Sequence, residues 1–166
     1  MEHFRRLPEI AGLELVPTEL DRVRRNTAPH VNQAIDRETE ERIRACATLS
    51  EAGLTERIRQ LHGEWDIERI LEINAPALAL AGLLFGLVRS RKWFFLSATV
   101  CGFLAWHGIK GWCPPIPALR RLGIRTRREI DAEIYALKVL RGDFRDAESS
   151  GLEDRMEDVF RRAQPI

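Results

Sequence analysis

The sequence predicts an all-α fold, in which an integral membrane hairpin of two helices carries amphipathic cytoplasmic helices on both sides. Two apolar blocks, INAPALALAGLLFGLV (73–88) and WFFLSATVCGFLAWHGI (93–109), are separated by only four residues. The 56 residues from 73 to 128 contain nine Lys or Arg and no Asp or Glu. On either side of this stretch the apolar residues recur at helical spacing, without the alternation of strands.

The net charge of +1 conceals an uneven distribution of charge. Residues 1–72 carry eleven basic against fifteen acidic side chains, and residues 129–166 carry six against ten. A hairpin buried in a soluble core is the alternative, but such a core would not usually exclude carboxylates from both flanks. We therefore expect an N-terminal helical cytoplasmic region (1–72), a transmembrane hairpin (73–112), and a border segment followed by amphipathic helices (113–166). Each apolar block is at the lower end of the length that spans a hydrocarbon core of about 30 Å.

The N-terminal region is expected to be helical after an irregular start. Residues 18–21 form a T-x-x-D helix start, and Thr27 followed by Pro29 forms a second one. The sequence then predicts an amphipathic helix that ends near 50–53. A further helix begins at about Thr55 and can continue directly into the first apolar block. Because the N-terminus lacks an uninterrupted apolar stretch, the hairpin itself is the first segment expected to target the chain to a membrane.

The region after the hairpin contains one strongly marked helix. Thr126 and Glu129 form a capping box at the start of TRREIDAEIYALKVLRG, and Gly142 is expected to end that helix. A weaker amphipathic piece follows at 152–160.

Small residues follow one face of each apolar helix. Helices in lipid associate through close backbone approach, which small side chains permit. The predicted packing residues are Ala75, Ala79, Gly82 and Gly86 in the first helix and Ala98, Gly102 and Ala105 in the second. These two ridges can close the hairpin on itself, and they can equally serve contact between protomers.

Aromatic and basic residues mark the expected borders of the membrane. The border residues are Trp65, Trp93, Trp106, Trp112, Cys113, Pro114 and Pro115. The residues expected to bind lipid headgroups are Arg89, Arg91, Lys92, Lys110, Arg120, Arg121, Arg125, Arg127 and Arg128. Because this basic cluster directly follows an apolar helix, we expect anionic headgroups as its partner rather than nucleic acid. Both termini are placed in the cytoplasm, because the charged flanking helices would otherwise cross the membrane without a signal. The expected location is the bacterial inner (plasma) membrane, in a multi-pass arrangement.

Two residues are candidates for chemistry. Cys113 lies near the basic cluster and at a helix end, both of which lower the pKa of a thiol. The simpler interpretation is a small border residue in a turn set by prolines. His107 is an ionisable group in an apolar helix, where it can bind a haem or another metal centre, or donate a hydrogen bond near Asn74. We favour a snorkelling or interhelical role over ligation, and the sequence shows no metal, cofactor or catalytic motif.

The motifs around the hairpin allow a family to be suggested. The hairpin followed by GWCP and LRRLGIRT resembles the YgaP-like transmembrane domain family of small bacterial inner-membrane hairpins. In the namesake architecture the hairpin anchors a cytoplasmic rhodanese domain that handles sulfane sulfur. The resemblance implies a membrane-border role for Gly111, Trp112, Cys113 and Pro114. This chain lacks the strand-rich setting of the rhodanese cysteine loop.

The sequence therefore predicts a non-enzymatic inner-membrane anchor or scaffold. We expect its flanking helices to bind a membrane protein partner or to form a homo-oligomer. Two alternatives stay open: a thiol or persulfide carrier that uses Cys113 in sulfur metabolism, and an accessory subunit of a larger membrane energy-converting complex with His107 near a cofactor.

Overall fold

All regular structure in residues 16–144, the part of the chain that the computed structural model describes, is helical. This confirms the all-α prediction. The elements in chain order are η2 (Thr18–Leu20), α1 (Arg22–Arg25), α2 (Pro29–Cys46), α3 (Glu51–His62), α4 (Ile67–Val88), η3 (Arg91–Trp93), α5 (Phe94–Lys110), α6 (Ile116–Arg121) and α7 (Arg127–Arg141). The amphipathic piece predicted at 152–160 lies outside the described residues.

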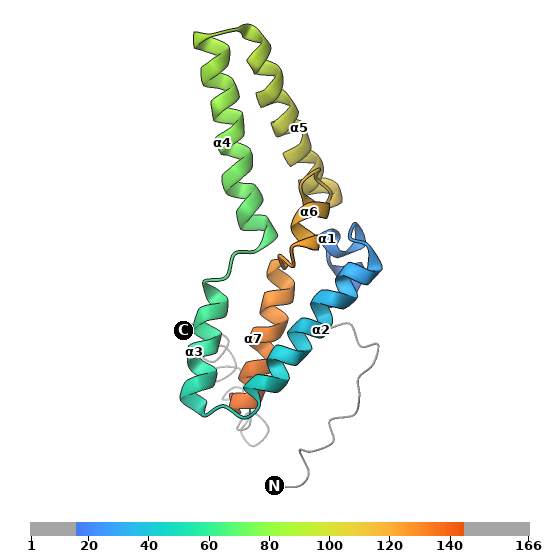
Figure 1. The fold of residues 1–166 in the computed structure, drawn as a ribbon, viewed down its shortest axis with the longest axis vertical. Coiled ribbons are helices and arrows are strands. Elements are labelled where there is room, and N and C mark those ends of the chain that lie inside the picture. Colours follow the sequence, from blue (N-terminus) through green and yellow to red (C-terminus); the bar gives the residue numbers. More distant parts are fainter. Residues whose placement is uncertain (1–15, 145–166) are drawn as a thin grey trace, which may run out of the picture.

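The molecule is elongated and has two parts (Figure 1). α4 and α5 lie side by side and form a hairpin at one end, which we define as residues 67–110. At the other end α2, α3 and α7 pack together, and the short α1 and α6 lie at the junction with the hairpin. We call this second part the cap and define it as residues 16–66 and 111–144.

Side chains at the helix N-termini set where the cap helices begin. Asp21 accepts hydrogen bonds from the backbone of Val23 (2.8 Å) and Arg24 (3.1 Å) and so starts α1. Ser50 caps α3, which therefore begins at Glu51 rather than near Thr55. The capping box predicted for α7 is confirmed, as is the glycine that ends it, which has a φ of 90°.

The helical conformation is interrupted between α3 and α4, so the two helices do not form one continuous helix. α3 ends at His62, and the Asp66 side chain accepts a hydrogen bond from the backbone of Arg69 (2.7 Å) to start α4. α4 begins at Ile67 and includes Pro76, which has no backbone N–H and so cannot donate the helical hydrogen bond at that position. The predicted direct continuation into the first apolar block is thus wrong. The helical spacing of the apolar residues continues through this region, and it does not reveal that Asp66 caps a new helix.

Two apolar clusters hold the cap together. The first joins α3 to α7 and the end of α2 and consists of Cys46, Leu54, Ile58, Leu61, Ile130, Ile134 and Leu137. The second joins the base of α4 to α1 and α6 and consists of Val23, Ile67, Leu71, Cys113 and Ile116. The first turns of α4 are therefore part of the cap core, which fixes the hairpin to the cap.

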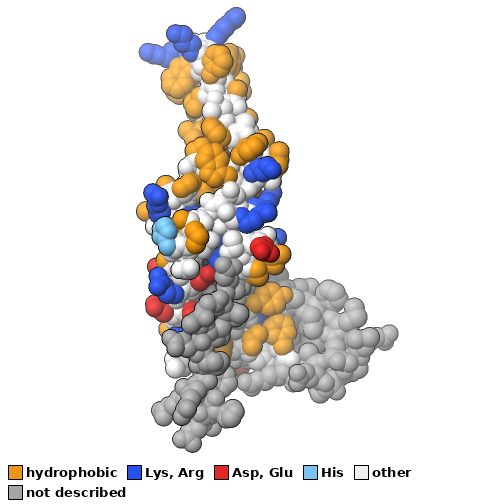
Figure 2. Space-filling view, turned by 90° about the vertical axis from the view of Figure 1, so that its right-hand side faces the viewer, with side chains coloured by type: hydrophobic (Ala, Val, Ile, Leu, Met, Phe, Trp, Pro, Cys, Tyr) orange, Lys and Arg blue, Asp and Glu red, His pale blue; other side chains and the backbone are white. Residues whose placement is uncertain are grey.

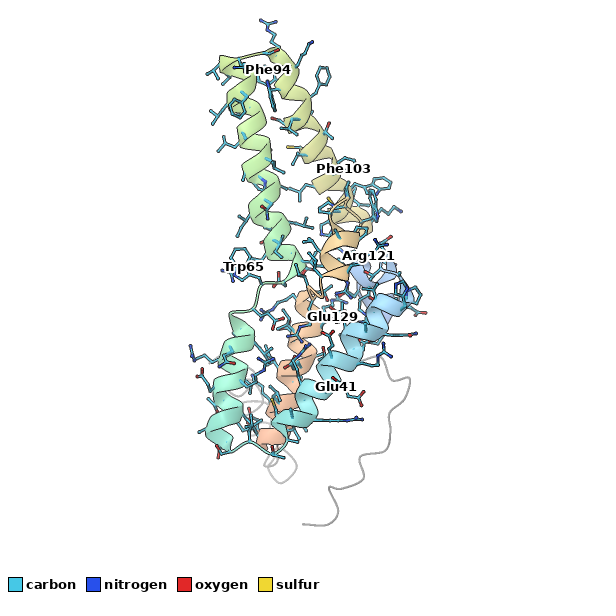
Figure 3. The ribbon with its side chains drawn as sticks, viewed as in Figure 1. Glu41, Trp65, Phe94, Phe103, Arg121 and Glu129 are labelled. Carbon is cyan, nitrogen blue, oxygen red and sulfur yellow. The ribbon has the colours of Figure 1, made fainter. Side chains whose placement is uncertain are left out.

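Glu129 lies at the centre of a buried charged network between α2 and α7 (Figure 3). Its carboxylate accepts hydrogen bonds from Arg24 (2.6 Å), from both terminal nitrogens of Arg120 (2.6 and 2.7 Å) and from the backbone of Thr126 (2.8 Å). Arg24 is also paired through two bonds with Asp36 (2.9 and 2.8 Å). The side chains of Arg24, Arg120 and Glu129 are almost completely buried.

Glu133, one turn further along α7, is the centre of a second group of ion pairs. Its buried carboxylate pairs with Arg125, with Arg57 (2.9 Å) and, more loosely, with Arg42 (3.5 Å). Arg125 in turn makes two hydrogen bonds to Glu64 in the α3–α4 connection (2.9 and 2.6 Å). Buried charges of this kind are stable only when each has its partners, because desolvation costs several kcal/mol per ion. The two glutamates thereby connect α1, α2, α3, α6 and α7.

Removing the charge of Glu129 is expected to destabilise the cap strongly. In Glu129→Gln, Arg24 and Arg120 stay buried but lose their shared carboxylate, which costs on the order of 3–5 kcal/mol. Chemical unfolding followed by circular dichroism measures the loss. The control is Glu56→Gln, which removes an exposed pair with Arg59 on α3 and should change stability little. Equal stability of the two variants would contradict the assigned role of Glu129.

The same network predicts sensitivity to acid. Burial alone raises the pKa of Glu129, but the hydrogen bonds and charge of Arg120 outweigh it and hold the pKa below its ordinary value of 4.5. For Glu133, burial is likewise outweighed by Arg125, so its pKa is also below 4.5. A lowered folded-state pKa stabilises the fold above the ordinary pKa, and this stability is lost as the pH falls through the folded value.

Unfolding curves measured between neutral pH and about pH 3 should therefore show a steep loss of stability below pH 4.5. The Glu129→Gln variant should lose less stability over the same pH interval, because one of the two titrating groups is gone. A pH profile that is identical in both proteins would contradict this account.

Candidate functional site

The outer surface of the hairpin is apolar along most of its length. Thirteen large apolar side chains on α4, η3 and α5 are exposed by 39% to 81%. They are Ile73, Leu78, Leu80, Leu83, Leu84, Phe85, Leu87, Val88, Trp93, Phe95, Phe103, Trp106 and Ile109. Figure 2 shows orange side chains along the projecting hairpin, with blue basic side chains at its tip and near its base. An exposed apolar surface of this extent is typical of a protein or membrane contact.

One helical stretch of the described residues is long and apolar enough to cross a membrane. It lies within Glu51–Val88, which comprises α3, the non-helical residues 63–66 and α4, and only 17% of its most apolar window is buried within the molecule. Because α3 is polar and part of the cap, the apolar run belongs to α4. The core helix of a soluble protein would be mostly buried, so the low burial distinguishes α4 from such a helix.

Glycines of α4 allow the close approach of α5. A Cβ placed on Gly82 would lie 2.7 Å from Ser97 Oγ and 3.0 Å from the Ser97 backbone nitrogen, and one on Gly86 would lie 2.7 Å from the Phe94 ring. Ser97 also donates a hydrogen bond to the carbonyl of Ala79 (2.7 Å). Figure 3 places Phe94 at the tip, between the two helices. On the α4 ridge Ala75 and Ala79 are half-buried, and the two glycines are buried.

The small residues of α5 do not face α4. Ala98, Gly102 and Ala105 are all exposed, and a Cβ on Gly102 would meet nothing within 4 Å. Of the two uses that the sequence left open for the α5 ridge, closure of the hairpin is therefore excluded, and contact with another protomer stays a prediction. Sequence spacing shows which residues share a helix face but not which face is turned to the neighbour, and one residue corresponds to a rotation of about 100°. Here Ser97 and Phe94 occupy the interface.

Six of the nine basic residues assigned to lipid headgroups are exposed. Arg89, Arg91 and Lys92 lie at the tip, and Lys110, Arg121 and Arg128 lie near the base of the hairpin. Arg121 is labelled near this junction in Figure 3. Arg128 also donates a hydrogen bond to the carbonyl of Leu20, and Arg127 is partly exposed and paired with Asp131 (3.1 Å).

Arg120 and Arg125 were wrongly assigned to lipid headgroups. Their side chains are only 1% and 3% exposed, and they pair with Glu129 and Glu133 inside the cap. They cannot contact a membrane surface in this fold. Their burial was not predicted, because their carboxylate partners lie outside the stretch 73–128 that has no acidic residues. The capping box identified Glu129 as a residue of the first turn of α7, but it does not indicate that the carboxylate is buried.

The four tryptophans lie at the two ends of the hairpin. Trp93 packs on Phe85 at the tip, with ring centroids 5.3 Å apart. At the base, Trp65 lies in the connection between α3 and α4, and the Cζ atom of Arg69 lies 4.8 Å from the centroid of its ring. Trp106 and Trp112 lie on and just after the last turns of α5, and Trp112 contacts Phe103. The side chains of all four tryptophans are exposed by 36% to 51%.

Cys113 is a buried core residue. It is 7% exposed and packs in the cluster that joins the cap to the hairpin, while the neighbouring Pro114 and Pro115 are exposed. Burial raises the pKa of its thiol, in the direction opposite to the expected activation by nearby bases. The arrangement favours a structural role for Cys113 over a role as a nucleophile.

His107 lies half-buried on α5. Its Nδ1 is buried and has no hydrogen-bond partner in the described part of the chain. Asn74, which the sequence suggested as its partner, donates instead to the carbonyl of Ile70 in its own helix (2.8 Å). Within residues 16–144 no group of three or more His, Cys, Asp or Glu side chains can hold a metal ion.

α1 caps the C-terminal end of α5, a contact that sequence reasoning missed. The guanidinium of Arg22 donates to the carbonyl of Gly108, and Asn26 Nδ2 donates to the carbonyl of Lys110 (2.8 Å). Gly111 ends α5 with a φ of 75°, and a Cβ there would lie 2.5 Å from the carbonyl oxygen of Arg22. Carbonyl groups at a helix end attract a cation and need partners. The first residue of GWCP therefore serves the contact between cap and hairpin.

Comparison with models of known families, with curated proteins and with solved structures finds no match. The resemblance to the YgaP-like transmembrane domain family stays a prediction from GWCP and LRRLGIRT.

The hairpin packing predicts opposite effects at two glycines. Gly82→Ala forces a methyl group against Ser97 and should destabilise the α4–α5 pair by about 1–3 kcal/mol. Gly102→Ala adds the same methyl group in open space and should be neutral or stabilising by up to about 1 kcal/mol, because alanine favours helix. Thermal unfolding in mild detergent compares the two variants. If Gly102→Ala were the more damaging substitution in a monomeric sample, the assignment of helix faces would be wrong.

Proposed function

We propose that this chain is a non-enzymatic membrane anchor whose α4–α5 hairpin crosses the bacterial inner (plasma) membrane twice. The observation that carries the proposal is the exposed apolar surface on both helices of a hairpin that projects from a charged, internally paired cap. In water this surface would promote aggregation, whereas in lipid it is matched to its surroundings. The exposed bases at both ends supply contacts to anionic headgroups.

The distribution of exposed charge supports a cytoplasmic cap. Arg89, Arg91 and Lys92 are the exposed bases at the tip. At the base of the hairpin, the exposed bases of α1, α5, α6 and α7 are Arg22, Arg25, Lys110, Arg121 and Arg128. This excess at the base favours the cytoplasmic side for the cap even after Arg120 and Arg125 are removed from the count. It also avoids moving the charged network of the cap across the membrane.

We propose further that the anchored cap meets a partner in the membrane or a second protomer. The open face of α5 around Ala98, Gly102 and Ala105 supports this part, because it is made of small residues and is not used within the hairpin. A helix from a second protomer or another membrane protein can approach there closely.

Fractionation and site-specific labelling test the anchor. The chain produced in bacterial cells should float with membranes and resist alkaline extraction. In spheroplasts, Ser90→Cys at the hairpin tip should react with a membrane-impermeant maleimide. Glu56→Cys, on the exposed surface of α3, should react only after the membrane is permeabilised.

The unaltered chain is the control, because its Cys46 and Cys113 are buried and Cys101 lies on the apolar helix α5. Recovery of the chain as a soluble monomer without detergent would refute the anchor. Labelling of Glu56→Cys in intact spheroplasts would refute the orientation.

A further inference from the structure

The apolar parts of the two hairpin helices have the same short length. In α4 the apolar run extends from residue 73 to residue 88, because Glu72 is exposed and Leu71 belongs to the cap core. In α5 it extends from 94 to 109, between η3 and Lys110. Each run has 16 residues, which corresponds to about 24 Å at 1.5 Å per residue. A typical hydrocarbon core is about 30 Å thick.

Contacts within the hairpin keep the two short runs at the same depth. Phe94, the first residue of α5, packs on Gly86 near the end of α4. Further along, Ser97 packs on Gly82 and donates to the carbonyl of Ala79. Since these contacts fix the register of the helices, one helix cannot slide along the other to lengthen the apolar surface.

Polar groups limit this surface at both ends. Arg89, Arg91 and Lys92 occupy the tip. At the base, Arg22 and Asn26 of the cap donate to the last carbonyls of α5, so the cap begins directly where the apolar run ends. Neither end can be drawn into the hydrocarbon without burying charge. Tilting does not help, because a tilted helix spans a smaller thickness.

We propose that the hairpin preferentially binds lipids with short acyl chains and locally thins a bilayer of ordinary thickness. This rests on the proposed function, because it concerns the same apolar surface. When a hydrophobic span is shorter than the membrane, the bilayer adapts at a cost that grows with the mismatch. Short-chain lipids around the hairpin lower this cost, so they are enriched in the shell of lipid that contacts it.

The test uses the purified full-length chain in vesicles of monounsaturated phosphatidylcholines. The acyl chains lengthen through the series from myristoleoyl and palmitoleoyl to oleoyl and erucoyl, at a constant fraction of phosphatidylglycerol. Insertion is measured by flotation in each vesicle. In mixtures of a brominated lipid with a competing lipid of another chain length, quenching of tryptophan fluorescence gives the relative binding of the two lipids. A several-fold preference for palmitoleoyl over erucoyl lipid is expected.

A lengthened hairpin is the matched control. Four residues, Leu-Leu-Ala-Leu, are inserted between Val88 and Arg89, and four more between Trp93 and Phe94. The insertions add one turn to each helix at the tip, about 6 Å, and leave the contacts of Gly82 and Gly86 in place. The preferred chain length of this variant should shift toward oleoyl and longer lipids.

The outcomes separate the two proposals. If the unaltered protein inserts but shows no preference for short-chain lipids, the inference is overturned and the anchor stands. The same holds if the lengthened variant inserts and its preferred chain length is unchanged. Failure to insert at every chain length overturns both. If the lengthened variant does not fold, the competition measured on the unaltered protein alone decides.

Discussion

The shared carboxylate of Glu129 is the interaction on which most of the structure depends. Two guanidinium groups, from Arg24 and Arg120, are buried against it, and burial of either without a partner would cost several kcal/mol. Because Arg24 comes from α1 and Arg120 from α6, the requirement for pairing brings the segments before and after the hairpin onto α7. Between α1 and α6 the chain forms α2, α3 and the hairpin, so this pairing places α1 beside α6 at the base of the hairpin.

The position of α1 links the charged network to the hairpin. Asp21 starts α1 and also accepts a hydrogen bond from Thr126, the N-cap of α7 (2.7 Å). On the same short helix, Arg22 reaches the end of α5 while Arg24 reaches Glu129. A helix of four residues has little stability of its own, so its conformation is set by these contacts. The cap and the hairpin are therefore joined through polar contacts as well as through the apolar cluster around Ile67.

The sequence was sufficient for the parts of the fold that local rules determine. The all-α class, the capping box of α7 and its terminal glycine follow from residues that are near one another in the chain. The break before α4 and the pairing of Arg120 and Arg125 with glutamates do not, because they depend on which distant residues meet. The face of α5 that packs on α4 could not be decided from the sequence for the same reason: Ala98 and Ser97 are adjacent in sequence, and only the contact with Ala79 decides between them.

The two buried arginines also change how the charge pattern is interpreted. A long stretch without acidic residues indicates lipid contact when its bases are exposed, but a base can equally be neutralised by a carboxylate that lies outside the stretch. Arg120 is in the second class, and Lys110 and Arg121 are exposed near the base of the hairpin. In the proposed membrane arrangement, lipid headgroups would meet only the exposed bases of this stretch, and these lie in two groups, one at each end of an apolar surface whose length is fixed by helix geometry. For a hairpin inserted as proposed, that geometry makes the thickness of the bilayer, rather than the number of basic residues, the property of the membrane that we expect to matter most.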